Sequence, residues 1–479
     1  MDQNRQPRET AAPGIAGIVL WAVVAAGAFH VAYASVNTSF LIVVYLFALL
    51  QLAGADTWRK AFYPGLAVGL TIAVLHLTFF WQIFSAAALV LWLVYAFWIG
   101  LFVALARLCS HRLGPARGLV LMPFLWTGLE YFRSELYYLR FSWLNVGYAF
   151  AAATWQVPFR DAGVYGVGFL LMTVAAVGHW FWRSSRIPAL AALFLGVLGV
   201  CAWGFVSAAK VGPPPTATVR VAGVQMEFPN EAAVLARLTD LVEKHPETEL
   251  VVLSEYTFGE PVPEPVKAWC RTNQRYLIVG GKDPAPGTHF YNTAFVVGPT
   301  GDLVFRQAKR VPIQFFDDGL PASEQKLWNS PWGKIGLCIC YDLGYRRVTD
   351  ELVRQGAQAI ICPTMDVEAW GRGQHALHAR VAPVRAAEYG VPVFRVASSG
   401  ISQHVLQSGH VLETGPFASD GAILATALAL GGPGRVPLDR WLAPMSFVVT
   451  ILVVLACAVL HLARARQIAR PSEPEAATE

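Results

Sequence analysis

Long apolar stretches occupy most of the first two hundred residues, and one more returns near the end of the chain. A helix that crosses a bilayer needs about 20 mostly apolar residues. Eight stretches approach that length, although the second and fifth are short. They run over about 14–34, 40–54, 61–81, 86–108, 118–131, 163–182, 187–208 and 441–463. We therefore predict an all-α membrane domain of about seven helices over residues 1–210 and an eighth helix over residues 441–463.

Between the seventh and eighth stretches the pattern changes to that of a globular domain. A proline-rich segment at 211–216 marks the boundary, and short strand-like runs then alternate with helical ones over residues 217–428. Alternating strands and helices are typical of an α/β domain. The mean hydropathy of +0.45 over 479 residues fits a membrane protein that carries such a domain.

The placement of Lys and Arg predicts an orientation, because cytoplasmic loops carry an excess of both. Basic residues precede the first helix, follow the eighth and lie in every second loop, whereas the loops after the first and third helices have none. This pattern places both termini, including a tail at 464–479, in the cytoplasm and residues 217–428 outside. Arg133, Arg140 and Arg160 fall on the outer side against the rule but are outnumbered. The first stretch is too long for a signal-peptide core and lacks a cleavage site, so we expect it to be retained.

Three strand ends in the α/β segment carry candidate chemistry. Glu255 follows the run "VVLS", Lys309 follows "DLVFRQA" and Cys340 ends "KIGLCIC". A thiol needs a nearby base to become a nucleophile, and a lysine can stabilise the oxyanion of acyl transfer. Cys338 would point to the same face of a strand as Cys340. We favour Cys340 because it is last on the predicted strand, where a turn can expose its sulfur.

Other functional classes have weaker support in the sequence. No basic stripe with interleaved aromatic residues indicates nucleic acid, and the net charge is a modest +5. No Gly-x-Ser-x-Gly elbow indicates a serine hydrolase. The spacing of Cys338 and Cys340 lacks a second ligand pair for zinc, and we expect solvated or capping roles for His375 and His378. We therefore predict no metal or other cofactor, and free thiols at Cys270, Cys338, Cys340 and Cys362.

These residues resemble the carbon–nitrogen hydrolase (nitrilase) superfamily over about residues 219–425. The resemblance is carried by Ser254-Glu255, by "YNTAFVVGPTGDLV", by Lys309, by "CYD" at Cys340 and by "RAAE" at 385–388. Together with seven helices before the domain and one after it, "FSWLNVGYAF" and "QHALHARVAPVRAAEYGVPVFRVASSGIS" resemble the apolipoprotein N-acyltransferase family. This resemblance implies an αββα sandwich fused to about eight transmembrane helices.

The resemblance also implies a mechanism and site residues. Glu255 would be the base, Cys340 the nucleophile, and Lys309 with a backbone N–H such as that of Tyr341 the oxyanion donors. A second acid of the family falls at Asp317 when the segment "RVPIQFFDDG" is aligned without gaps, and an acid after the Cys-Tyr pair falls at Asp342. Trp370, Phe315 and Phe316 are candidates for contact with lipid, although each could equally be simple packing.

The implied reaction moves an acyl chain from a phospholipid, through a cysteine thioester, to the N-terminal amine of a diacylglyceryl-cysteine lipoprotein. The expected setting is a monomer in the bacterial inner membrane, with residues 217–428 facing the periplasm. The alternative is a membrane-tethered amidase or hydrolase of the nitrilase type, in which water is the acceptor. A non-catalytic scaffold is disfavoured by the intact Glu-Lys-Cys set. The two enzymes differ in whether the site faces the bilayer or open solvent.

Overall fold

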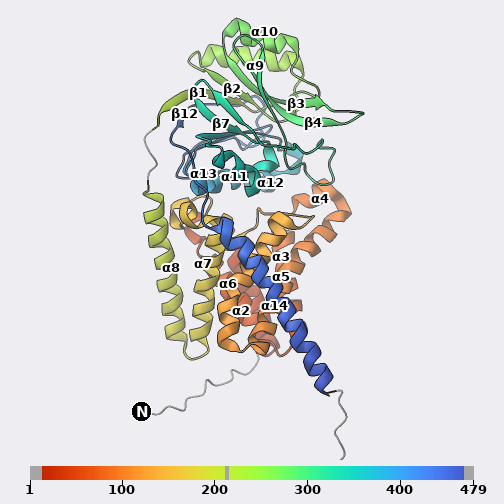
Figure 1. The fold of residues 1–479 in the computed structure, drawn as a ribbon, viewed down its shortest axis with the longest axis vertical. Helices are drawn as coiled ribbons and strands as arrows, with labels where there is room; N and C mark the ends of the chain where they lie inside the picture. The colour runs from red at the N-terminus through yellow and green to blue at the C-terminus, as the bar shows by residue number, and fades with distance from the viewer. Residues whose placement is uncertain (1–12, 211–214, 469–479) are drawn as a thin grey trace, which may run out of the picture.

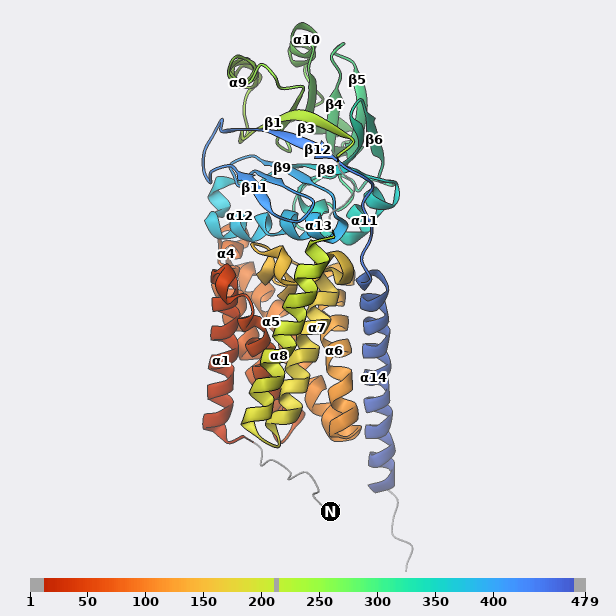
Figure 2. The same cartoon turned by 90° about the vertical axis from the view of Figure 1, so that its left-hand side faces the viewer.

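The computed structural model describes residues 13–210 and 215–468, with side chains described up to residue 460. Arg5, Arg8, Arg470 and residues 211–214 of the predicted linker lie outside the described residues. Helices form one half of the molecule and the α/β domain the other (Figure 1). The described chain begins and ends at the end of the helices remote from the α/β domain (Figure 2).

Every predicted apolar stretch is helical in the structure. The helices are α1 (Ile15–Ala34), α2 (Leu41–Leu52), α3 (Trp58–His76), α4 (Phe79–Phe84), α5 (Ala88–Arg112), α6 (Pro115–Tyr131), α7 (Phe159–Trp182), α8 (Arg186–Ala208) and α14 (Asp439–Ile468). The third predicted stretch is divided between α3 and the short α4. Within the described residues, five segments are long and apolar enough to cross a membrane: Ile15–Ala34, Phe79–Arg112, Phe159–Trp182, Arg186–Ala208 and Asp439–Leu460. The structure thus supports several spanning helices but does not establish eight.

The α/β domain consists of two six-stranded sheets that pack face to face. The first sheet has the order β12-β1-β2-β3-β4-β5 and the second β11-β10-β9-β8-β7-β6. Their strands are β1 (Ala217–Val224), β2 (Leu250–Leu253), β3 (Tyr276–Pro284), β4 (Phe290–Val297), β5 (Leu303–Ala308), β6 (Leu327–Ser330), β7 (Gly333–Leu337), β8 (Ala359–Thr364), β9 (Val393–Ala397), β10 (Gln403–Val405), β11 (Val411–Thr414) and β12 (Ile423–Leu430). Gly223 of β1 lies against Val396 of β9, where a Cβ would come within 2.5 Å of the valine side chain.

Helices cover both outer faces and complete an αββα sandwich (Figures 1 and 2). The first sheet is covered by α9 (Glu231–Lys244) and α10 (Glu264–Asn273), and the second by α11 (Arg346–Arg354), α12 (Arg372–Ala379) and α13 (Val381–Tyr389). The sequence of α9 explains its place. Asn230 caps it by accepting from Ala233 N at 2.8 Å. Val234, Leu238 and Leu241 recur at helical spacing and are fully buried against the sheet.

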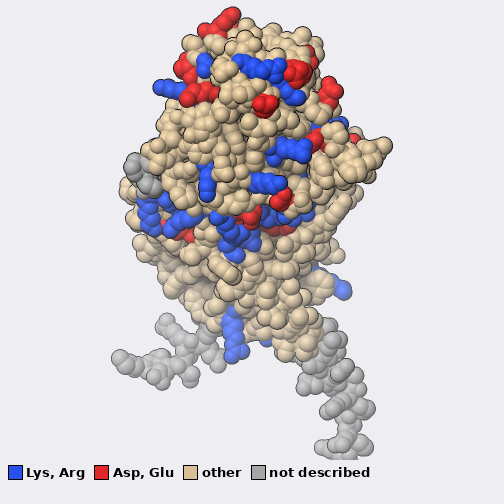
Figure 3. Space-filling model, turned by 45° about the horizontal axis from the view of Figure 1, so that its top comes forward, with Lys and Arg blue, Asp and Glu red and all other residues tan. Residues whose placement is uncertain are grey.

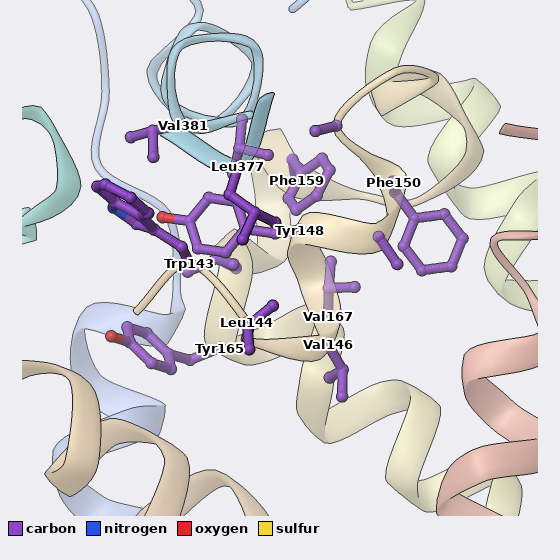
Figure 4. Close-up of a cluster of buried hydrophobic side chains, with 14 of the residues drawn as sticks. Trp143, Leu144, Val146, Tyr148, Phe150, Phe159, Tyr165, Val167, Leu377 and Val381 are labelled. Carbon is purple, nitrogen blue, oxygen red and sulfur yellow. The ribbon is translucent and has the colours of Figure 1, made fainter. Parts of the chain in front are cut away.

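The second helical layer, α11 to α13, lies between the sheets and the membrane helices. One continuous apolar core runs from the helices through this layer into the α/β domain. Figure 4 shows part of the junction, where the segment from Trp143 to Phe150 and the start of α7 meet Leu377 of α12 and Val381 of α13. On the face shown in Figure 3, Lys and Arg side chains gather near the level of this junction, and the helices below carry few charges.

Buried carboxylates also join the two halves at a break in α7. Gly163 has φ +74° and ψ 173° inside this helix, so the backbone N–H groups that follow it have no helical acceptor. Val164 N donates to Glu388 of α13 at 2.6 Å, and Tyr165 N donates to Asp439 of α14 at 3.0 Å. Carboxylates at the N-terminal end of a helical segment are stabilised by the exposed N–H groups and the helix dipole. Glu388 of the α/β domain and Asp439 of α14 thereby cap the continuing part of α7 together.

The break predicts that Gly163→Ala destabilises the protein. A Cβ at Gly163 would lie 2.3 Å from the Asp439 carboxylate, and a left-handed φ costs a non-glycine residue about 1–2 kcal/mol. With overpacking of roughly 1–3 kcal/mol added, the thermal midpoint in detergent should fall clearly. Gly199→Ala in α8 is the control, because nothing lies within 4 Å of its Cβ position. Equal midpoints for the two variants would contradict the assigned role of the break.

Candidate active site

The three strand ends singled out in the sequence meet between the two sheets. Glu255 lies two residues beyond β2 and Lys309 directly after β5, both in the first sheet, while Cys340 follows β7 of the second. All three side chains are buried. The Lys309 ammonium lies 2.8 Å from Glu255 Oε1.

A second carboxylate completes the environment of Lys309. Asp318 Oδ2 lies 2.7 Å from the ammonium, and its other oxygen accepts from Tyr256 and Asn292, each at 2.8 Å. Burial lowers the pKa of Lys309, but Asp318 and Glu255 together hold it well above its ordinary value. The lysine is therefore charged. Burial raises the pKa of Asp318, yet the ammonium outweighs burial and keeps this pKa below its usual range.

The pKa of Glu255 is shifted in the opposite direction from that of Asp318. Burial, and secondarily the negative charge of Asp318, raise the pKa of Glu255 despite the opposing effect of Lys309. Its Oε1 also accepts from Asn292 at 2.6 Å, and its Oε2 accepts from Met365 N at 2.8 Å. A fixed carboxylate with a raised pKa is suited to receive a proton from a neighbouring group.

Cys340 lies in a sharp turn rather than on a strand. Strand β7 ends at Leu337, and Cys340 begins a 3-10 turn that runs to Gly344 with φ +51° at the cysteine. This corrects the prediction that the strand continues to Cys340. A left-handed φ on a non-glycine residue is typical of a functional site whose surroundings enforce it. The thiol donates to Met365 O at 3.7 Å, and burial raises its pKa well above the ordinary value, so it is protonated at rest.

Asp342 explains why the strand stops early. Its carboxylate accepts from Ile339 N at 3.2 Å, in place of a sheet partner, and from Val311 N at 2.7 Å. Burial raises its pKa to about 6. Asp342 thus links the turn that contains Cys340 to the segment that follows Lys309. On the other side of the turn, Arg385 donates to the carbonyls of Leu343 and Gly344 at 3.0 and 2.7 Å.

The prediction that Asp317 is the second acid is wrong by one position. Asp317 is exposed, whereas Asp318 is buried beside Lys309. Phe315 has φ +72° in this segment, so the chain turns there and the second aspartate faces inward. Counting residues without gaps could not detect that turn. The carboxylate is held in place because Ile313 N donates to Asp318 Oδ2 at 2.8 Å.

A buried polar cluster beside the site was missed in the sequence. Asp366 follows Met365 and accepts from Gln374 at 2.9 Å, from His378 at 2.8 Å and from Arg395. Burial raises the pKa of Asp366, but His378 and Arg395 outweigh it and hold this pKa well below its ordinary value. Met365 forms hydrogen bonds with both Glu255 and Cys340. The cluster around Asp366 therefore fixes the backbone that lies between these two side chains.

The expectation that His375 and His378 are solvated is also wrong, since both are buried. The His378 ring stacks on Trp143 of the membrane domain, with centroids 4.5 Å apart. Their i, i+3 spacing carried no signal of this contact. Within the described residues, no group of three or more His, Cys, Asp or Glu side chains could hold a metal ion. All seven cysteines are free thiols.

Cys340 opens into a cavity of about 960 Å³, its mouth included. Side chains of both halves line it, and most of them are apolar. From the helical half come Leu77, Phe79, Phe80, Ile83, Phe84, Leu91, Val94, Tyr95, Trp98, Arg133, Leu139, Arg140, Phe141 and Trp143; from the α/β domain come Ile313, Gln314, Phe315, Phe316, Cys340, Tyr341, Met365, Asp366, Trp370, Gln374 and His378. The three aromatic residues predicted to contact lipid are therefore among its walls.

Four aromatic residues form a rim where the two halves meet at the cavity. Phe84 of α4 lies 5.9 Å from both Phe315 and Phe316 between ring centroids, and Phe316 lies 6.0 Å from Trp370. Phe315 is 65% exposed, although large apolar side chains are normally buried. Below this aromatic rim, the cavity follows α5 from Leu91 to Trp98, about 10 Å along the helix axis.

Comparison with known proteins identifies both halves. Residues 220–428 match the family model described as carbon-nitrogen hydrolase, so the α/β domain is a domain of that class. Residues 25–177 match the model described as the apolipoprotein N-acyltransferase N-terminal domain. The resemblance to the apolipoprotein N-acyltransferase family noted in its motifs is thereby confirmed.

Curated relatives agree over most of the chain. The apolipoprotein N-acyltransferase of Nitrosomonas europaea is 25% identical over 371 residues, which cover 69% of this chain and 73% of the relative. That of Geobacter metallireducens is 25% identical over 442 residues, 80% and 84% of the two chains. Among solved structures, Nit3 of Saccharomyces cerevisiae, a member of the nitrilase superfamily, is 19% identical with a TM-score of 0.40, covering 46% of this chain and 93% of that one.

The geometry predicts different effects for two adjacent aspartates. Asp318→Asn removes one of the two carboxylates of Lys309. Since a hydrogen bond to a charged group contributes roughly 1.5–3 kcal/mol, the rate of thiol acylation should fall about ten- to a hundredfold. Asp318 also raises the pKa of Glu255. Because Glu255 accepts a proton only when ionised, the acid limb of the pH profile should move to lower pH in the variant.

Asp317→Asn is the matched control. It removes an exposed carboxylate from the neighbouring position, and exposed charges typically contribute under about 1 kcal/mol. Its single-turnover rate and acid limb should match the wild type. A larger effect at Asp317 than at Asp318 would contradict the placement of the two side chains.

Proposed function

We propose that this protein transfers an acyl chain from a phospholipid, through a thioester on Cys340, to the N-terminal amine of a diacylglyceryl-cysteine lipoprotein. The observation that carries the proposal is the cavity. Its floor holds Cys340, and its apolar walls come from membrane helices as well as from the carbon–nitrogen hydrolase domain. The relatives named apolipoprotein N-acyltransferase support the same reaction.

In the first half-reaction, Glu255 takes the thiol proton as Cys340 Sγ attacks the ester carbonyl of the donor. The carbonyl oxygen becomes an oxyanion beside Lys309. An ammonium has three N–H donors, and Glu255 and Asp318 occupy two of them. The third N–H stabilises the oxyanion, with the backbone N–H of Tyr341 as a second donor. Collapse breaks the C–O bond, Glu255 returns its proton to the leaving alcohol, and a lysophospholipid departs.

In the second half-reaction, the free amine of the lipoprotein attacks the thioester. Glu255 accepts a proton from the amine, the C–S bond breaks, and the cysteine regains its proton from Glu255. Lys309 stabilises the second oxyanion as it does the first. The product is an amide, and the enzyme returns to its starting state.

A hydrolase would need water as the acceptor, and the cavity walls disfavour it. The apolar side chains along α5 give a lipid ester surroundings similar to those in the bilayer. The same side chains offer water few hydrogen-bond partners. Trp370, Phe315 and Phe316 contact the lipid chains at the aromatic rim. The catalytic set alone does not distinguish the two reactions.

The reaction is tested by incubating purified protein with phospholipid labelled in its acyl chains. Mass spectrometry should find the acyl mass on Cys340 and, after a diacylated lipopeptide is added, on that peptide. Cys340→Ala should abolish the adduct. Cys338→Ala is the control, because Cys338 is buried and is not among the residues that line the cavity; it should retain most activity. Equal loss of adduct in both variants would refute the assignment of the nucleophile.

The proposed orientation places the carbon–nitrogen hydrolase domain in the periplasm. Thr288 lies in the exposed turn between β3 and β4, and Ser184 in the exposed loop between α7 and α8 at the far end of the helices. In cells with a permeable outer membrane, an impermeant maleimide should label Thr288→Cys directly. It should label Ser184→Cys only after the inner membrane is disrupted. The reverse pattern would overturn the orientation.

A further inference from the structure

Two arginines at the junction between the halves have no acidic partner that explains their positions. Arg140 precedes Trp143 in the helical half and lines the cavity that contains Cys340. Arg347 lies in the first turn of α11. Their guanidinium carbons lie 5.5 and 5.7 Å from the centroid of the same ring, that of Tyr345. In the described part of the chain, neither side chain forms an ion pair.

The acidic groups near Arg347 do not offset its burial and the charge of Arg140. The nearby Glu135 is engaged by α11 itself, since Arg346 N donates to its Oε1 at 3.4 Å. Arg346 in turn donates to the Tyr131 hydroxyl at 2.6 Å and lies over its ring. Glu135 therefore balances Arg346. Burial, and secondarily the charge of Arg140, lower the pKa of Arg347 and outweigh the opposing charges of Glu135 and Asp342.

The start of α11 adds further positive potential. Its first turn contains Arg346 and Arg347 but no acidic residue, and Tyr345 at its N-cap makes no side-chain cap. The N-terminus of a helix favours anions and disfavours cations. Arg140 and Arg347, near this helix N-terminus, would be stabilised by an anion whose oxygens accept hydrogen bonds from both. Arginine is suited to this role because its donors match the geometry of phosphate oxygens.

The site also lies at a fixed short distance from the nucleophile. The hydroxyl of Tyr341, the residue after Cys340, donates to the backbone carbonyl of Arg140 at 2.9 Å. One tyrosine side chain thus separates the backbone at Cys340 from the backbone at Arg140. In a glycerophospholipid only the glycerol bonds separate the ester carbonyls from the phosphate. In addition, the buried Arg140 Nε has no hydrogen-bond partner among the described residues.

We propose that Arg140 and Arg347 bind the phosphodiester of the phospholipid donor and so place its ester carbonyl at Cys340. The inference rests on the proposed function, in which a phospholipid supplies the acyl chain. The phosphodiester is a polar group by which the protein can recognise the donor, whereas the acyl chains alone provide none. The headgroup beyond the phosphate lies on the exposed side of Arg347, where the structure encloses it less.

The test compares two donors that differ in the phosphate. Acylation of Cys340 is measured in neutral detergent micelles, with either phosphatidylethanolamine or a diacylglycerol carrying the same chains. Arg140→Gln and Arg347→Gln should each lower kcat/KM for phosphatidylethanolamine about ten- to a hundredfold, mainly through KM, because each removes charged hydrogen bonds to the phosphate. Their rates with diacylglycerol should stay within twofold of the wild type. The neutral micelle removes any general attraction to an anionic surface.

Arg354→Gln is the matched control on the same helix. Arg354 is exposed, lies 3.6 Å from Asp350 and is at the opposite end of α11 from Arg347, so both donors should react at wild-type rates. Equal loss with the two donors in the Arg140 and Arg347 variants would show a structural role and overturn the proposal, as would no loss with either. Failure of the wild-type protein to acylate Cys340 from any lipid would refute the proposed function instead.

Discussion

The Lys309 ammonium is the charge on which the site depends. Burying an isolated ion costs several kcal/mol even after the protein relaxes, and Lys309 is completely buried. It is stable there only because Glu255 and Asp318 flank it within 2.8 Å. Each carboxylate is held by further donors, Asn292 and Met365 N for Glu255 and Tyr256 with Ile313 N for Asp318. Glu255 and Lys309 are held rigidly because the buried ammonium needs both carboxylates beside it.

The sequence predicted those parts of the site that sit at the ends of regular elements. Glu255, Lys309 and Cys340 follow strand-like runs that form β2, β5 and β7, so their positions in the sandwich follow from the pattern of strands. The second acid lies in an irregular segment, where the left-handed conformation of Phe315 decides which aspartate faces inward. No periodicity specifies that conformation. The apolar stretches likewise predicted the long helices of the helical half, but not the interruption that separates α3 from α4.

Sequence patterns could not predict the contacts between distant parts of the chain. His378 stacks on Trp143, more than two hundred residues earlier, and Glu388 bonds Val164 across the junction. His378 and Glu388 are residue types that are typical of an exposed helix surface. They are buried only because the α/β domain docks on the membrane helices. The walls of the cavity have the same origin. Helix α5 contributes residues that pattern alone assigns to lipid contact, yet several face Cys340.

The capping of α7 from across the junction restricts how the two halves can move. Drawing them apart would strip Val164 of its acceptor and separate Arg440 of α14 from Glu388 and Asp350, and breaking one buried pair costs about 3–5 kcal/mol. On the opposite side of the molecule, α4 contacts the domain through Phe84 at the aromatic rim. Aromatic contacts are worth only about 0.5–1.5 kcal/mol each beyond their buried area. The two halves are therefore held together more strongly along α7 and α14 than at α4, so the contact at α4, beside the cavity that contains Cys340, is the easier one to open.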